Sequence, residues 1–162
     1  MNKAIKHLNK SEEFRSEYAK AKRFGVKINI NNETSSYFDH ETNTVQWNSL
    51  EGNNIEAGIS SPATTLAHEI THAVEFNELG LEGFEASLEA PVLSTDYSIG
   101  NDGIPEIKVI YGVSQEEIRA TNFERTVQSQ LGEPLRQNYR DAGPVNVESS
   151  TYFCHQGNEG CR

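Results

Sequence analysis

The stretch SPATTLAHEITHAVEF, residues 61–76, constrains the fold most, because it predicts a helix with two separate faces. At about 100° per residue, its apolar side chains fall within roughly one third of the circumference and can face a core. They are Leu66, Ile70, Ala73 and Val74. His68 and His72 lie close together on another side, one turn apart, and Glu69 lies between the two faces. The core therefore does not need the histidines.

The two histidines and the glutamate form an HExxH motif, which is typical of a zinc site. One helical turn brings both imidazoles to one point, where they can share a Zn²⁺ ion. Glu69 can then reach a water on that metal and accept its proton. The alternative is that both histidines are solvent-facing or hydrogen-bonded bystanders. Ser61 and Pro62 provide a good helix start, which is the context that the motif requires.

A second helix is predicted from Gln115 to about Leu131, and it offers the third ligand that such a site needs. Ser114 and Glu117 form a capping box at its start, and Gly132 and then Pro134 end it. No third histidine follows the motif at short spacing, so a carboxylate on this helix is the expected ligand.

Glu117 is the best candidate, because small Ala120 three residues later would let the two helices approach closely. Glu116 is then expected near the ligands or on the surface, and Glu124 could orient a ligand histidine. Glu116 and Glu124 remain alternative ligands. The competing interpretation is a surface helix whose charges form salt bridges.

Hydrolysis of a peptide also needs a group that stabilises the oxyanion. Arg136 and Tyr139 follow the second helix three residues apart, on one side of a helical turn. A tyrosine hydroxyl can donate a hydrogen bond, and an arginine adds positive charge. The spacing alone is a weak signal, and its position after the other two blocks strengthens it.

The blocks LAHEITHA, EEIRATNFE and LRQNY, in this order, resemble the NleD-like family of bacterial effector metallopeptidases. They are also similar to blocks of the clostridial neurotoxin light chains. The resemblance implies a zincin fold of the gluzincin type and a zinc-dependent endopeptidase. It implies His68, His72 and Glu117 as zinc ligands, Glu69 as the base, and Arg136 with Tyr139 at the oxyanion.

We therefore expect an α+β zincin fold, with a small mixed sheet packed on the HExxH helix and on the second helix. Residues 1–162 are expected to form a single domain, with the family-like part at about 25–140 and a tail at 141–162. The resemblance further implies a secreted effector or toxin that a specialised secretion system delivers into a target cell. Its N-terminus shows no signal peptide. A catalytically silent domain that binds metal and recognises a protein partner is the alternative, and an adaptor domain with incidental histidines is a third class.

The remaining elements are predicted from periodicity and turn residues. A helix is expected at 12–24, capped by Ser11, and a strand at 26–30. Two further strands are expected in SSYFD and NTVQWN, the latter as an edge strand that pairs with substrate. Trp47 could line the cleft, although a core position is the more common outcome. A loop is expected around 53–58. Residues 81–113 are expected to be either a binding loop region or partly ordered, and only EIKVIYG resembles a strand there.

Charge and cysteines restrict the partners. The net charge is −10, and residues 1–27 carry eight Lys/Arg against three Asp/Glu while the remainder carries six against twenty-one. This acidic body argues against nucleic acid or an anionic membrane as the main partner and suits a polypeptide, and we expect a monomer. No apolar stretch is long enough for a membrane span. Cys154 and Cys161 could form a disulfide or remain free thiols.

Overall fold

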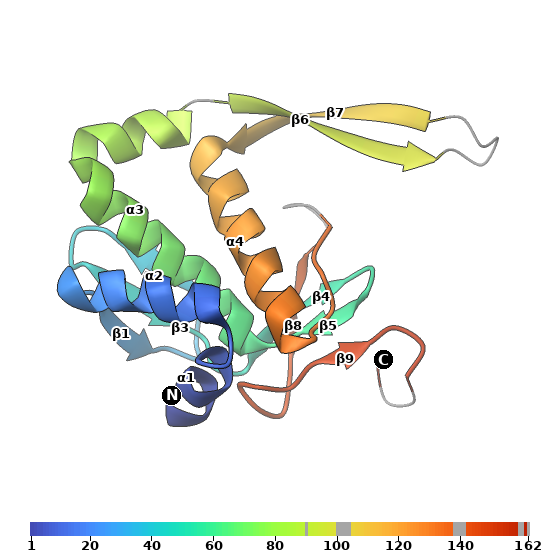
Figure 1. Cartoon of the computed structure of the whole chain (residues 1–162), viewed down its shortest axis with the longest axis horizontal. Helices are drawn as coiled ribbons and strands as arrows, with labels where there is room; N and C mark the ends of the chain where they lie inside the picture. Colours follow the sequence, from blue (N-terminus) through green and yellow to red (C-terminus); the bar gives the residue numbers. More distant parts are fainter. Residues whose placement is uncertain (90, 100–104, 138–141, 159–160, 162) are drawn as a thin grey trace.

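The computed structural model describes residues 1–89, 91–99, 105–137, 142–158 and 161, with only the backbone of 90–112 where it is described. The protein has an α+β fold (Figure 1). Its helices are α1 (Asn2–Leu8), α2 (Glu12–Arg23), α3 (Pro62–Glu89) and α4 (Gln115–Leu131). Its strands are β1 (Lys27–Ile30), β2 (Tyr37–Asp39), β3 (Thr44–Trp47), β4 (Glu51–Ile55), β5 (Gly58–Ser60), β6 (Pro91–Ile99), β7 (Pro105–Ser114), β8 (Gly143–Asn146) and β9 (Cys154–His155).

The helix boundaries follow the capping signals in the sequence. Ser11 accepts a hydrogen bond from the backbone of Phe14 at the start of α2, and Ser114 accepts one from the backbone of Glu117 at the start of α4. Gly132 ends α4 in the left-handed conformation, with φ 71°. These predictions are confirmed, whereas α1 was not predicted as a separate helix.

The long helix α3 is kinked at Gly80, where φ 70° and ψ 174° leave the helical region. Gly80 therefore ends the first helical segment as expected. Of the two expectations for 81–113, partial order is the one confirmed, because residues 81–89 continue as a second helical segment and β6 and β7 form an antiparallel hairpin. The run EIKVIYG lies in β7, as its strand-like pattern predicted. The hairpin projects from the C-terminal end of α3 and the N-terminal end of α4 (Figure 1).

The first sheet has the strand order β1-β3-β2 and is mixed, because β3 pairs with β1 in parallel and with β2 antiparallel. The expected strands and the mixed sheet are confirmed. The prediction of NTVQWN as an edge strand was wrong, since β3 is the central strand and both of its backbone edges already have partners. It has no edge left to pair with a substrate.

A second sheet, with the order β8-β4-β5-β9, was not predicted. Residues 53–58 were expected to form a loop because of their asparagines and glycine. Instead β4 pairs with both β5 and β8, so long-range backbone pairing overrides the local preference. The C-terminal strand β9 pairs with β5, and Cys154 forms a disulfide with Cys161.

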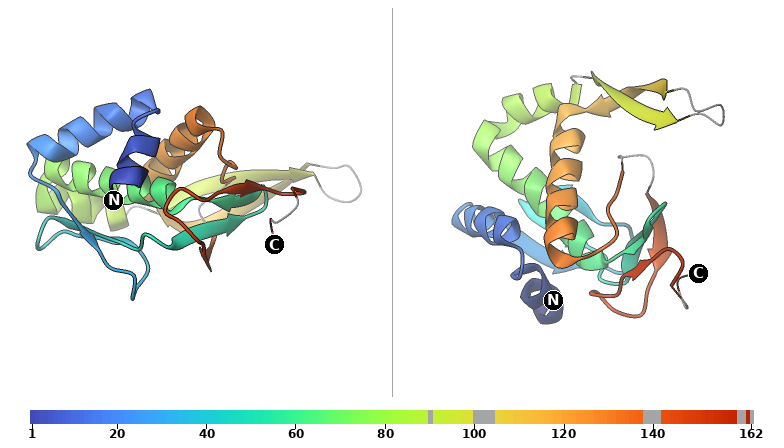
Figure 2. Two further views of the ribbon diagram at one scale, coloured as in Figure 1. Left: turned by 90° about the horizontal axis from the view of Figure 1, so that it is seen from below. Right: turned by 45° about the vertical axis from the view of Figure 1, so that its right-hand side comes forward.

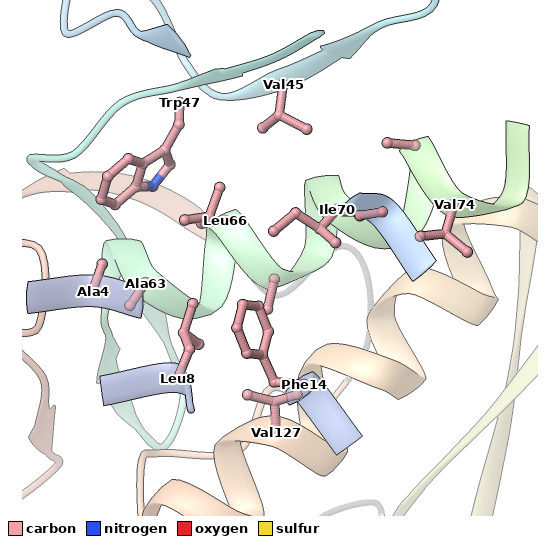
Figure 3. Packing of buried hydrophobic residues seen from close by; sticks show 13 residues of the cluster. Ala4, Leu8, Phe14, Val45, Trp47, Ala63, Leu66, Ile70, Val74 and Val127 are labelled. Atoms are coloured by element: carbon pink, nitrogen blue, oxygen red, sulfur yellow. The ribbon is translucent and has the colours of Figure 1, made fainter. Parts of the chain in front are cut away.

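The core lies between α3 and the helices and strands that surround it (Figure 3). Leu66, Ile70 and Val74 are fully buried there, as the helical periodicity predicted. Trp47 is also fully buried, and its indole N–H donates to the carbonyl of Pro62 at 2.8 Å, so it belongs to the core rather than to a cleft. Among the described residues, no helix is long and apolar enough to cross a membrane.

Candidate metal centre

The first segment of α3 and the N-terminal half of α4 pack side by side and bring the predicted ligands together (Figure 1). Ala120 is fully buried on α4, and its small side chain allows the helices to approach. The two histidines and Glu69 belong to α3, whereas Glu116, Glu117 and Glu124 belong to α4. The pairing of these helices is what converts two sequence motifs into one site.

The carboxylate of Glu117 lies between the two imidazoles. Among the described residues, two groups have ligand atoms within 4.8 Å of one another, and they are His68 with Glu69 and His72, and His72 with Glu116 and Glu117. Oε2 of Glu117 lies 3.3 Å from Nε2 of His68 and 3.8 Å from Nε2 of His72. The two imidazoles are nearly perpendicular, with ring centroids 4.6 Å apart. The structure thus brings together the residues that the sequence predicted as ligands, with the Nε2 atoms of both histidines facing the same carboxylate.

The opposite nitrogen of each imidazole faces a carboxylate of its own. Nδ1 of His68 lies 3.2 Å from Oε2 of Glu124, and Nδ1 of His72 contacts Oε1 of Glu116. Both glutamates are buried. Glu124 therefore lies where a residue that orients a ligand histidine is expected, and Glu116 lies inside the site rather than on the surface.

A buried polar network holds Glu124 in place. Nη1 of Arg136 donates to Oε2 of Glu124 at 3.0 Å, and the amide of Gln128 donates to Oε1 at 3.0 Å. Gln128 also accepts a hydrogen bond from the backbone N–H of Arg136. Sequence reasoning missed Gln128, although its position one turn after Glu124 is a usable signal. Arg136 is buried beside the site, whereas Tyr139 lies in 138–141, outside the described residues.

Another buried carboxylate anchors the start of α3. Glu133 accepts hydrogen bonds from the backbone N–H and the hydroxyl of Ser61, at 2.9 and 2.8 Å. It also contacts Nε2 of His7 at 2.7 Å, so this one residue connects α1 and the segment after α4 to the start of α3. No local pattern in the sequence indicates this contact.

Glu69 is buried near both imidazoles. One ligand atom from each of His68, Glu69 and His72 can be chosen so that the three lie within 4.8 Å of one another. Burial raises the pKa of the Glu69 carboxyl above its usual range, although the two histidines counteract this effect. A raised pKa brings a carboxyl group closer to the range in which it can exchange protons at neutral pH.

The carboxylates around His68 determine its protonation in the metal-free protein. Burial alone would lower the pKa of His68, but the contacts with Glu117 and Glu124 outweigh it and raise this pKa to about 10. For Glu124, burial acts to raise the pKa, and the contacts with His68 and Arg136 reverse that effect and lower it. Without a metal, the centre is therefore held together by ion pairs.

The donor set fits a zinc ion. In a tetrahedral site with bonds of about 2.0–2.1 Å, neighbouring ligand atoms lie roughly 3.3–3.4 Å apart. The separation of 3.3 Å between Glu117 and His68 matches this value, and the 3.8 Å to His72 is slightly longer. Two imidazole nitrogens and one carboxylate oxygen are also a ligand set that catalytic zinc uses.

Comparison of the chain with protein-family models, with curated proteins and with solved structures finds no match. The α+β fold and the cluster of two histidines and three glutamates are therefore the basis for any functional conclusion.

Proposed function

We propose that this protein is a zinc-dependent endopeptidase with a zincin architecture of the gluzincin type. The observation that carries the proposal is that Oε2 of Glu117 lies 3.3 Å from Nε2 of His68 and 3.8 Å from Nε2 of His72. These three residues would hold the zinc ion. The buried carboxylates on the far side of each imidazole support this assignment, because metal-binding histidines usually donate their other N–H to such a group.

A zinc ion supplies a Lewis acid that lowers the pKa of water toward neutrality. The residues of this chain would transfer the protons and stabilise the oxyanion. Glu69 accepts the proton of the attacking water and then delivers it to the leaving amine, a role that its burial and raised pKa support. Arg136 supplies positive charge close to the site, and together with Tyr139 it is proposed to stabilise the oxyanion.

The resemblance of the three sequence blocks to NleD-like effectors extends the proposal. On this basis the protein acts as a monomer, as an effector or toxin that is delivered into a target cell and cleaves a protein there. The buried Arg136 and the paired Glu116 and Glu117, placed after an HExxH helix, are the features that support it.

Cleavage of a peptide library by the zinc-loaded protein tests the function, with Glu69→Gln as the matched variant. Glu69→Gln retains the shape of the side chain and all proposed ligands, so it should bind zinc like the parent. We expect the parent to cleave a defined set of peptides and the variant to lose at least about 100-fold in rate, the usual contribution of a general base.

Equal cleavage by the parent and by Glu69→Gln would exclude this mechanism. Zinc binding by both proteins without cleavage of any peptide or protein would instead favour a metal-binding domain that recognises a partner. Zinc content below about 0.1 per chain in untagged protein, with a control metalloprotein that retains its metal, would reject the metal centre itself.

A further inference from the structure

Positive charge is concentrated at one end of this acidic protein. Residues 1–27 carry eight Lys/Arg against three Asp/Glu, whereas the remaining residues carry six against twenty-one. The charge is therefore distributed unevenly between the N-terminal segment and the remainder of the chain. The negative charge of the remaining residues disfavours contact with an anionic membrane. The positively charged N-terminal segment, residues 1–27, is not disfavoured in this way.

Seven of the eight cations are exposed. Six of them lie on α1, on α2 and in the turn between these helices and define a basic face, and they are Lys3, Lys6, Lys10, Arg15, Lys22 and Arg23. The seventh is Lys27, at the start of β1. None of the seven forms an ion pair with a carboxylate in the part of the chain that the structure describes. The eighth, Lys20, is instead bound by Glu17 and Glu78, each at 3.1 Å. Glu12 and Glu13 are the exposed acidic residues in the segment.

The position of α2 directs these charges outward. The helix buries Phe14, Glu17 and Ala21 against the rest of the protein. Arg15, Lys22 and Arg23 lie within about 100° of one another on its opposite side, and Ala19 and Glu12 lie in the same sector. Both α1 and α2 lie on one side of α3, and the sheets lie on the other (Figure 2). The acidic body therefore does not cover the basic face.

We propose that the basic face docks on an anionic phospholipid surface. Two exposed apolar residues at its margins favour this partner, because Met1 is 50% and Phe24 is 37% exposed, and Phe24 directly follows Arg23. A combination of Lys/Arg with apolar side chains is typical of segments that lie in a membrane interface. A nucleic acid would attract the same cations, but it has no apolar layer in which these two side chains could be buried.

Electrostatics also fixes the orientation. Each Lys or Arg near a membrane rich in anionic lipid contributes about 1 kcal/mol, and the attraction decays within roughly 8–10 Å at physiological salt. The basic face meets this condition on contact, whereas acidic residues on the far side of the molecule are farther from the lipid. The protein would therefore bind peripherally with α1 and α2 against the bilayer. This inference does not depend on the proposed peptidase activity.

Sedimentation with lipid vesicles at physiological salt tests the proposal. One set of vesicles contains phosphatidylcholine alone, and the other contains phosphatidylcholine and phosphatidylserine at about three to one. We expect binding only to the second set. The combined variant Lys6→Glu, Lys22→Glu and Arg23→Glu should weaken it by at least about 100-fold, since each charge removed costs about fivefold.

A control variant, Asn122→Glu with Arg125→Glu, adds negative charge on the outer side of α4 and should bind vesicles like the parent. Circular dichroism establishes that all variants are folded. The proposal is overturned if the parent ignores anionic vesicles, if it binds both vesicle types equally, or if the basic-face variant binds as well as the control. Binding to duplex DNA without binding to vesicles would also overturn it.

Discussion

At the scale of single residues, the central feature is the environment of each imidazole. Glu117 faces Nε2 of both histidines, while Glu124 and Glu116 face the two Nδ1 atoms. In metal sites, a carboxylate at Nδ1 of a histidine orients the ring and leaves Nε2 for the metal. In the proposed zinc site, Glu124 and Glu116 of α4 would orient the two rings in this way.

Zinc binding should release protons. The pKa of His68 is raised from 6.5 to about 10 in the metal-free protein, so the imidazole is protonated between these values and must lose its proton to bind metal. At pH 7.5 we expect about one proton per zinc, and an apparent affinity that increases with pH. Titration calorimetry in two buffers with different ionisation enthalpies measures this number. Binding heats that do not depend on the buffer would contradict the prediction.

Glu124→Gln should weaken zinc binding by about 10- to 100-fold, because loss of a carboxylate behind a ligand histidine typically has this effect. The variant keeps the size of the side chain and leaves all three proposed ligands in place. Competition with a fluorescent chelator measures the affinity. Glu85→Gln, on the exposed surface of α3, is the matched control. If both variants bound zinc as tightly as the parent, Glu124 would have no positioning role.

At the scale of elements, the helices were predictable and the sheets were only partly so. Ser11, Ser114 and Gly132 are local signals, and they mark helix ends in the structure as they do in the sequence. The strands β4 and β5 depend on pairing with β8 and β9, which are about 90 residues away in the chain. No local pattern carries that information, nor does it reveal that β3 has a partner on each side.

We predict that the candidate metal site depends on the close packing of α3 against α4. Ala120→Leu would place a larger side chain in a fully buried position and force the helices apart. Such overpacking usually costs about 1–3 kcal/mol, so the free energy of unfolding should fall by this amount. Zinc affinity should fall with it, because Glu117 would move away from the histidines.

Urea unfolding and chelator competition measure these two quantities. Ala19→Leu, at an exposed position on α2, makes the same chemical change and should leave both unchanged. Unaltered zinc affinity in a destabilised Ala120→Leu protein would show that the ligands do not depend on a close approach of the helices.

At the scale of the whole molecule, the sequence predicted a cluster of histidines and glutamates, and the structure brings these residues together. HExxH stands out by its spacing, whereas Glu117 and Arg136 were chosen for their position after this motif. The assignment of Glu124 to one histidine and of Glu116 to the other required the three-dimensional packing of α4. The structure also shows that Glu133 contacts His7 of α1, 126 residues away in the sequence, as well as Ser61 at the start of α3.

The disulfide between Cys154 and Cys161 anchors the C-terminal strand β9, which pairs with β5. A loop with 7 residues of sequence separation restricts the unfolded chain modestly, so its removal should cost about 2–3 kcal/mol of stability. Urea unfolding of the Cys154→Ser, Cys161→Ser variant measures this loss. A variant as stable as the parent would show that the tail contributes nothing to the folded state.

The most direct test of the central claim is the position and coordination of zinc in the loaded protein, determined by anomalous diffraction at the zinc edge. We predict one zinc ion per chain, bonded to Nε2 of His68, Nε2 of His72 and a carboxylate oxygen of Glu117 at about 2.0–2.2 Å. A crystal of the loaded protein with no zinc between α3 and α4, or with zinc bound elsewhere, would contradict the account.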